Sequence, residues 1–481
     1  MRTISMPRLC WAIFLSLFAC GLGVAQTAEQ RTSQYFESVR KSPPLLEAFL
    51  REMPKGGDLH NHLSGAVYAE SYLQFAINDK VCIDRKVLAF APPPCDESRN
   101  TVAAEDALTD PLLYREVIDA LSMRDFHAYS EPGLSESGED HFFATFGRFG
   151  LVSRIHTGEM LAEVVSRAGR QNESYLELTV GLDHTAAGLG SKVGWSDDFN
   201  QMRQKLTSTG IEGAVDGVRK VLDQAEAEKD RLLECQDAAH ADPGCKVTLR
   251  YIHEVYRGTP KEQVFAEIMT GFALVKADHR YVAVNPVMPE DGYTSMRDYE
   301  LHMKMFDYFH KLYPEFHLTE HAGELAPGLV PPSGLRFHIR EAVETGDAQR
   351  IGHGVDVMQE DKPIELLHEM SEKHVAVEIC LTSNDLILGV KGAHHPFPVY
   401  RKYGVPVVIA TDDEGVSRSD MTHEYLRAVE SYGLTYADLK KLVHNSIEYS
   451  FVEAEVKRQL LSDLDSRFAQ FEAQEWPDFP K

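Results

Sequence analysis

The chain has few basic residues for its size. Lys and Arg together number 49 against 74 Asp and Glu, a formal net charge of −25 over 481 residues. A surface with this balance repels a phosphate backbone or an anionic lipid headgroup. The composition therefore argues against nucleic acid as a partner and favours a small neutral or cationic ligand.

Cysteine is also scarce, at 7 residues, and no two have Cys-x-x-Cys spacing. This argues against a cysteine-rich zinc site and against the zinc deaminases of nucleic acids, whose signature includes Pro-Cys-x-x-Cys. In an oxidising compartment, short loops favour pairing Cys82 with Cys95 and Cys235 with Cys245, with Cys380 as a lone thiol. The alternative is that all five stay unpaired.

Residues 1–25 predict a signal peptide. Arg2 and Arg8 precede an apolar run over residues 9–24, and Gly23 and Ala25 supply small residues for a cleavage site. We therefore expect an exported protein, periplasmic or secreted. Two alternatives stay open. In the first, the apolar run serves as a single membrane anchor, although it is short for a membrane span. In the second, Cys20 carries a lipid that attaches the chain to a membrane.

Residues 26–53 predict a helical extension, and residues 54–481 predict one α/β domain. Apolar runs rich in strand formers alternate with stretches of helical periodicity, which is typical of parallel βα units. The runs span residues 57–63, 175–180, 246–252, 281–287, 316–320, 350–355, 375–381 and 405–411. Eight units predict a (β/α)8 TIM-type barrel with its active site at the carboxyl ends of the strands. Residues 80–140 predict an insertion after the first strand, in the form of an irregular loop or small cap.

His60 and His62 lie on the first predicted strand. Alternate side chains of a strand share a face, so the two imidazoles project together, about 6 to 7 Å apart along the strand. Such a pair suits catalytic zinc, which takes three protein ligands and keeps one position for water. Taken alone the pair is a weak signal, because 21 His are spread over the chain.

Three more predicted strand ends carry candidate groups. His-Ala-Gly-Glu ends the fifth strand, Gly-His-Gly the sixth and Thr-Asp-Asp the eighth. Each one, considered singly, is as well explained by a satisfied histidine or a helix N-cap. Together with the first-strand pair they predict one site at the barrel mouth, containing His321, Glu324, His353, Asp412 and Asp413.

These motifs resemble the adenosine deaminase family of metal-dependent hydrolases, and the exported lead-in is similar to its secreted growth-factor branch. The matching segments are residues 53–57, 60–62, 321–324, 350–354, 382–384, 395–396, 411–413, 445 and 450–451. The resemblance implies one Zn²⁺ per chain, held by His60, His62, His321 and Asp412. It also implies hydrolysis of the 6-amino group of adenosine or 2′-deoxyadenosine, a C–N bond of a cyclic amidine, to give inosine and ammonia.

The resemblance assigns a role to each remaining group. Glu324 protonates the ring nitrogen beside the reacting carbon, for which a buried, protonated carboxyl is suited. His353 orients the attacking hydroxide, Asp412 accepts its proton, and Asp413 hydrogen-bonds the imidazole side of the purine. A non-catalytic binding or signalling protein, the interpretation from another class, would be expected to lack one of these groups.

Two positions depart from the family pattern and affect the substrate prediction. Ser64 stands where relatives often carry an acid that contacts the ribose 5′-hydroxyl, and Met288 where they carry a glycine whose N–H contacts the purine. Adenosine remains the first expectation. The alternative is another aminopurine or a 5′-modified adenosine.

The expected partner is a small purine nucleoside. By likeness to the secreted branch, the extension, with Tyr35, Phe36 and Leu45, forms a homodimer. The alternative is that this extension packs onto its own barrel.

Overall fold

The computed structural model describes residues 26–126 and 136–476. The predicted signal peptide, and with it the lipid site at Cys20, lies outside the described residues. Among the helices of the described ranges, none is both long enough and apolar enough to cross a membrane.

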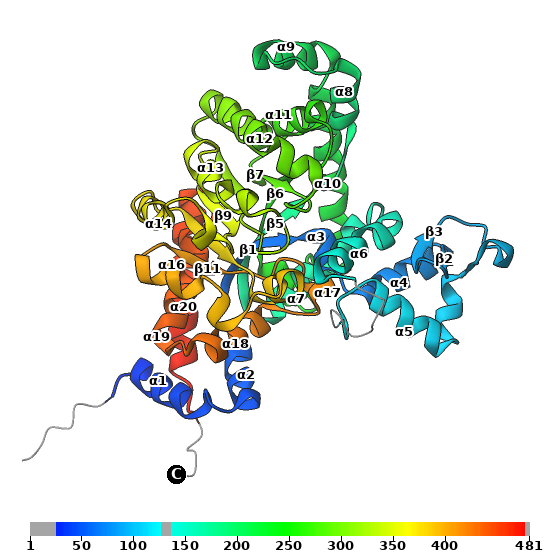
Figure 1. Ribbon diagram of the computed structural model, residues 1–481. Coiled ribbons are helices and arrows are strands. Elements are labelled where there is room, and N and C mark those ends of the chain that lie inside the picture. The colour runs from blue at the N-terminus through cyan, green and yellow to red at the C-terminus, as the bar shows by residue number, and fades with distance from the viewer. Residues whose placement is uncertain (1–25, 127–135, 477–481) are drawn as a thin grey trace, which may run out of the picture.

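Eight parallel strands form the barrel, and their order around it is their order along the chain (Figure 1). They are β1 (Gly56–His62), β5 (Glu173–Val180), β6 (Thr248–Tyr256), β7 (Tyr281–Val287), β8 (His317–Ala322), β9 (Arg350–His353), β10 (Ala376–Ile379) and β11 (Val407–Ile409). Each overlaps the apolar run predicted for it, so the (β/α)8 prediction is confirmed. The runs are continuous because helices cover the outer face of the strands while side chains fill the interior.

The barrel closes where β1 meets Thr411 and Asp412, which follow β11. Asn61 and Asp412 form a parallel bridge. The Asp412 N–H donates to His60 O at 2.8 Å, and the His62 N–H donates to Asp412 O at 2.9 Å. Asn61 Nδ2 also donates to Thr411 Oγ1 at 3.0 Å. The seam is therefore made by the backbone of residues predicted to form the site.

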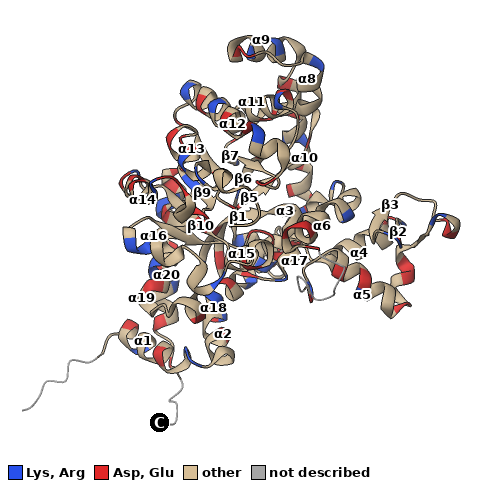
Figure 2. Cartoon of the chain, viewed as in Figure 1, with Lys and Arg blue, Asp and Glu red and all other residues tan. Residues whose placement is uncertain are grey.

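Helices of the α/β units surround the strands, and their apolar positions face inward. In α7, residues 160, 161, 164, 165 and 168 are buried, at the spacing of one helix face. Figure 2 shows acidic and basic residues interspersed over the outer helices. These helices are α7 (Thr157–Arg170), α8 (Thr185–Val193), α9 (Phe199–Thr209), α10 (Glu212–Leu232), α11 (Lys261–Ala277), α12 (Tyr293–Leu312), α13 (His338–Glu344), α14 (Pro363–Glu372), α15 (Leu381–Leu388), α16 (Phe397–Tyr403), α18 (Met421–Tyr432), α19 (Tyr436–Glu448) and α20 (Ala454–Glu472).

The N-terminal extension forms α1 (Ala28–Val39) and α2 (Pro43–Glu52). A capping box at Thr27 starts α1, and a proline opens α2, as expected of helix N-termini. Phe36 is buried against Tyr436 of α19, with ring centroids 6.3 Å apart, and Tyr35 stacks on Trp476 at 4.6 Å. Leu45 is 40% exposed. The extension thus packs onto α18, α19 and α20 of its own chain.

The insertion after β1 is more regular than predicted. After α4 (Ala69–Asn78), the strands β2 (Cys82–Asp84), β3 (Ala89–Ala91) and β4 (Thr101–Ala103) form an antiparallel sheet in the order β3-β2-β4, followed by α5 (Pro111–Ala120). This unit projects from the barrel in Figure 1, and α6 (Gly138–Ser153) returns the chain to it. Of the two predicted forms, the small cap matches this unit, and its sheet left no trace in the sequence because three-residue strands are too short to show alternation.

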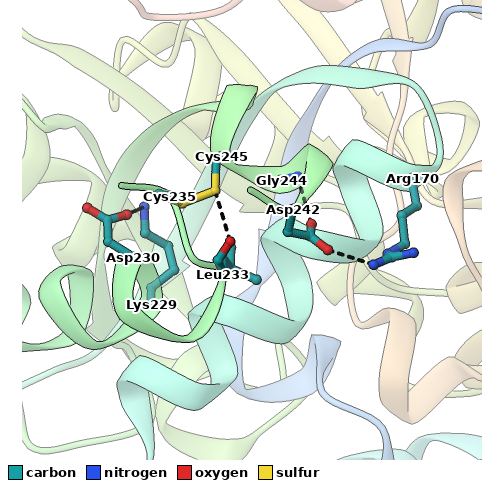
Figure 3. The surroundings of a disulfide bond; sticks show 8 residues. All are labelled: Arg170, Lys229, Asp230, Leu233, Cys235, Asp242, Gly244 and Cys245. Carbon is teal, nitrogen blue, oxygen red and sulfur yellow. Dashed lines mark hydrogen bonds and ion pairs between the residues drawn. A yellow bond between two sulfur atoms is a disulfide. The ribbon is translucent and has the colours of Figure 1, made fainter. Parts of the chain in front are cut away.

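Both predicted disulfides, Cys82–Cys95 and Cys235–Cys245, are present, and Cys380 is a buried free thiol. Figure 3 shows the second, which links the segment after α10 to the turn before β6. In that turn Asp242 accepts from the Gly244 N–H at 2.8 Å and from Arg170 of α7 at 2.6 Å. The disulfide and this ion pair hold the turn to two outer helices.

Candidate active site

His60, His62, His321 and Asp412 converge at the carboxyl ends of the strands. His62 Nε2 lies 3.2 Å from His321 Nε2. Asp412 Oδ1 lies 3.3 Å from His60 Nε2 and 3.5 Å from His62 Nε2. All four side chains are buried. Two groups of residues each bring their possible ligand atoms within 4.8 Å of one another. The first is His60, His321, His353 and Asp412, and the second is His62, Asp412 and Asp413.

The Nδ1 atoms of two of these imidazoles face oxygen acceptors. His60 Nδ1 lies 2.6 Å from Glu378 Oε2. His321 Nδ1 lies 2.9 Å from Asn285 Oδ1, and because the same oxygen accepts the His321 backbone N–H, the amide orientation is fixed. An acceptor at Nδ1 holds the proton there and leaves the lone pair on Nε2.

The third imidazole has a carboxylate on its outer side. His62 Nδ1 lies 3.5 Å from Glu254 Oε1, and Glu254 Oε2 accepts from Tyr256 Oη at 3.0 Å. A Cβ at Gly181 of the neighbouring strand end would stand 2.6 Å from Glu254 Oε2, so a larger residue there would make this carboxylate shift. Glu254 is thereby held beside the ring.

These contacts test whether the residues fit a metal. With the protons on Nδ1, the Nε2 lone pairs of His62 and His321 face each other at 3.2 Å, an arrangement that a cation between them stabilises. His60 Nε2 is buried and makes no hydrogen bond within the described part of the chain. Three imidazole nitrogens and one carboxylate, each imidazole with an oxygen acceptor behind it, therefore fit a metal site.

Asp412 is oriented by its neighbour on the α15 side. Ser383 Oγ donates to Asp412 Oδ2 at 2.6 Å, which leaves Oδ1 toward the histidines. Burial opposes ionisation, but the contacts to His60 and the nearby imidazoles of His353 and His62 hold the pKa of Asp412 well below its usual range. The carboxylate is therefore ionised and available as a ligand.

Glu324 follows β8 and lies at the same site. Its carboxyl is 3.5 Å from His353 Nε2. Burial, with the nearby charges of Asp412 and Glu290, raises the pKa of Glu324 well above its usual range. Glu290 also fixes the local backbone, because it accepts from the Glu324 N–H at 2.8 Å and the Gly323 N–H at 3.0 Å. A protonated carboxyl is thus held beside a buried imidazole.

Asp413 and Ser64 lie together on the β1 side of the mouth. A Cβ at Gly65 would stand 1.5 Å from Asp413 Oδ1, so the glycine next to Ser64 makes room for this carboxyl. Burial and the charge of Asp412 raise the pKa of Asp413 well above its usual range. Ser64 is half-buried in the short helix α3 (Leu63–Ala66).

Met288 comes directly after β7 with φ +87°, in the left-handed region that favours glycine. Its side chain is 39% exposed, and a Cβ at Gly258 would stand 2.8 Å from Met288 Cε. His353 (φ +69°) and Asp412 (φ +61°) also have left-handed backbones. Three strand ends at the mouth therefore carry non-glycine residues in a conformation that costs on the order of 1 kcal/mol.

The sequence prediction omitted the residues behind the histidines. Glu378 also receives the Arg350 guanidinium at 2.5 Å, and Arg350 reaches Glu177 at 2.6 Å. Although burial opposes it, Arg350 and the hydrogen bond from His60 lower the pKa of Glu378 to about 2. The signal was present, because Glu177, Asn285 and Glu378 interrupt otherwise apolar strands, where a polar residue needs a buried partner.

Comparison with known proteins places these residues in a family context. A family model described as "Adenosine deaminase" matches residues 163–467. The adenosine deaminase of Pseudoalteromonas translucida is 33% identical over 196 residues, 40% of this chain and 54% of that protein. The adenosine deaminase of Escherichia coli is 37% identical over 147 residues, 30% of this chain and 41% of that protein. The matches thus span about half, or less, of the relatives' length.

Solved structures share the fold at low identity. An adenine deaminase from Arthrobacter aurescens has a TM-score of 0.54 at 17% identity, covering 86% of this chain and 98% of that one. The N6-methyl-AMP deaminase of Arabidopsis thaliana has a TM-score of 0.55 at 20% identity, covering 87% and 98%. An amidohydrolase from Burkholderia ambifaria with bound Zn has a TM-score of 0.54 at 18% identity, covering 94% and 98%.

The likeness to the secreted growth-factor branch stays a prediction. The family itself is shown by the model match, which covers more than half of the chain and includes His321, Glu324, His353 and Asp412. The chain belongs to the adenosine deaminase family of metal-dependent hydrolases.

Proposed function

We propose that this protein is a zinc-dependent hydrolase that converts adenosine or 2′-deoxyadenosine to inosine and ammonia. The observation that carries the proposal is the pairing of a protonated carboxyl, Glu324, with a buried imidazole, His353, beside three converging histidines and an ionised aspartate. The family membership and the adenosine deaminase relatives support the choice of reaction.

His60, His62, His321 and Asp412 would hold one Zn²⁺, as the Zn-bound amidohydrolase of the same fold supports. When bound, the metal supplies a water whose pKa is lowered toward neutrality. The Nδ1 contacts to Glu378, Asn285 and Glu254 keep the three rings turned toward this point.

Residues of the chain perform the proton transfers. Glu324 gives its proton to the ring nitrogen beside the amino-bearing carbon, which makes that carbon electrophilic. His353 Nε2 orients the attacking oxygen, and Asp412 takes the proton that this oxygen loses. Asp413, with its raised pKa, donates a hydrogen bond to the imidazole side of the purine. The proton on Asp412 passes to the amino nitrogen, the C–N bond breaks and ammonia leaves. The proton from Glu324 stays on the ring nitrogen, the remaining proton of the attacking oxygen returns to Glu324, and the carbon keeps a carbonyl.

A second candidate is an aminopurine other than adenosine, and Met288 favours it. The strained backbone at Met288 and its half-exposed side chain give this strand end a bulk that glycine would not. Relatives of the same fold include an adenine deaminase and an N6-methyl-AMP deaminase. Ser64, without a charge, would leave the 5′ end of a nucleoside weakly held.

The test is the adenosine-to-inosine absorbance change of the purified protein, measured with its zinc content. Turnover that stops on chelation and returns with zinc supports reaction and metal together. A zinc-loaded protein that is inert toward adenosine overturns the substrate but keeps the site. A panel of adenine, AMP and N6-methyl-AMP, run on wild type, Met288→Gly and Ser64→Asp, then identifies the substrate.

We also propose export of the mature chain. Two disulfides in the described residues favour an oxidising compartment. Mass spectrometry of the mature N-terminus separates cleavage near Ala25 from lipid attachment at Cys20, and an intact N-terminus in a cytosolic fraction overturns the proposal.

A further inference from the structure

The outer nitrogen of His353 faces a nitrogen rather than an oxygen. His353 Nδ1 lies 3.1 Å from Asn384 Nδ2, the amide nitrogen of a residue on α15. An amide nitrogen only donates, so it satisfies an imidazole nitrogen that carries no proton. His353 therefore differs from the other histidines of the site, whose Nδ1 atoms face oxygen acceptors.

The orientation of the Asn384 amide follows from a backbone group. The Phe397 N–H donates to His395 Nδ1 at 3.1 Å. A backbone N–H cannot accept, so His395 Nδ1 has no proton and the ring must carry its proton on Nε2. His395 Nε2 lies 3.0 Å from Asn384 Oδ1 and donates to it. The reversed amide would set Asn384 Nδ2 against this N–H, with two donors facing each other.

The side chains that make these hydrogen bonds are shielded from water. Asn384 and His353 are fully buried, and His395 is 3% exposed. Burial, with the charge of Arg427, lowers the pKa of His395 to about 4, so the ring is neutral and holds one proton at neutral pH. A buried group that lost its partner here would have no water to replace it.

We propose that Phe397 N–H, His395 and Asn384 form a hydrogen-bond relay that fixes the proton of His353 on Nε2. Asn384 and His395 are then positioning residues, and this role rests on the proposed deamination. With its proton on Nε2, His353 donates to an oxygen at the site and is not a metal ligand through that atom. Asn384→Asp would replace the donor with an acceptor and move the proton to Nδ1.

The direct test is the tautomer of His353, read from ring-nitrogen NMR of zinc-loaded protein with ¹⁵N-labelled histidine. Loss of one signal set in His353→Gln assigns the ring. We expect a protonated Nε2 and a bare Nδ1 in wild type, and a protonated Nδ1 in Asn384→Asp. A wild-type ring protonated on Nδ1, or a tautomer unchanged in Asn384→Asp, overturns the relay.

This readout separates the relay from the proposed function, because the tautomer is measured without turnover. A protein inert toward every aminopurine but with the expected tautomer would sink the function and keep the relay. In an active protein we expect Asn384→Asp to lower kcat about a hundredfold, with zinc content unchanged and KM changed little. Zinc loss or a KM effect alone would instead show a structural role and overturn the positioning role.

Two further variants guard against misfolding. Asn445→Asp is the matched control, because Asn445 Nδ2 donates to Val407 O outside the relay at 2.9 Å, and it should leave the His353 tautomer unchanged. His395→Gln can still donate to Asn384 Oδ1 whereas His395→Leu cannot, so Gln should retain at least tenfold more activity. Equal loss in both contradicts the relay.

Discussion

Two groups of histidines at the barrel mouth use the same side chain in opposite ways. His60 of β1 and His321 of β8, which lie across the barrel from each other, have oxygen acceptors at Nδ1, Glu378 and Asn285. His353 at the end of β9 has an amide donor from α15, Asn384. The role of each imidazole is therefore set by the partner behind the ring and not by its distance from the centre. The predictions below test this contrast.

The largest effects are expected where a proton donor or a proposed metal ligand is removed. Glu324→Gln should lower turnover at least a thousandfold while keeping zinc, because it removes the donated proton and leaves every ligand in place. His321→Ala should lose both zinc and turnover. Zinc analysis with an inosine assay checks the pair, and near-wild-type activity in Glu324→Gln would refute the proton route.

On the ligand side, Glu378→Gln should weaken zinc binding about 10- to 100-fold, because the carboxylate that holds the Nδ1 proton of His60 is lost. Competition with a chelator measures the affinity, and activity should return with excess zinc. Glu372→Gln, an exposed glutamate on α14, is the matched control. Equal affinities in the two variants would contradict the role of Glu378.

On the relay side, Glu424 supports the first turn of α15, because it accepts from the Thr382 N–H at 3.1 Å and from Ser419 Oγ at 2.9 Å. Burial raises the pKa of Glu424 from 4.5 to about 7. Between these values the folded chain holds a proton that the unfolded chain has released, so this group's contribution to stability falls as pH rises.

Glu424→Gln should therefore be more stable than wild type at pH 8, by about 3 kcal/mol, and the difference should vanish near pH 4. Urea unfolding of both proteins at the two pH values measures it. A variant less stable than wild type at pH 8 would show that the carboxylate is needed in its charged form.

The smallest expected effect gives the most direct test of this contrast, because the same substitution is made behind two different rings. Asn285→Asp keeps an oxygen acceptor for His321 Nδ1, so zinc content and turnover should change only a few-fold. The same substitution at Asn384 reverses a donor and should be severe. If the two variants lower kcat to the same extent, the partner at Nδ1 does not decide the role of the ring.

The strand pattern was predictable from the sequence because buried parallel strands are continuous apolar runs, and all eight were located. His60 and His62 were predictable for a similar reason, since a period of two puts them on one face. The ends of three more predicted strands supplied His321, Glu324, His353, Asp412 and Asp413, the family resemblance gave them roles, and the structure brings them to one mouth. Short strands such as β2 left no periodic signal, so the sheet inside the predicted cap was not foreseen.

The partners behind the rings were harder to predict. Glu378 and Asn285 contact histidines of other strands, and which strands adjoin is a property of the closed barrel. Asn384 and His395 were within recognised motifs, but their function depends on a chain of donors that ends at a backbone N–H. No spacing rule describes such a series of hydrogen bonds, because its members come from β9, α15, the loop before α16 and the first residue of α16.

The closing seam has a consequence for the order of folding. The backbone bonds between Asp412 and the β1 histidines join the first and last strands of the barrel, and Thr411 lies 353 residues after its partner Asp58. Contacts of such high sequence separation form late, because loop closure must come first. A nascent chain that ends before residue 412 would lack both the seam and one proposed ligand, so we expect full metal affinity only after the last strand docks on the first.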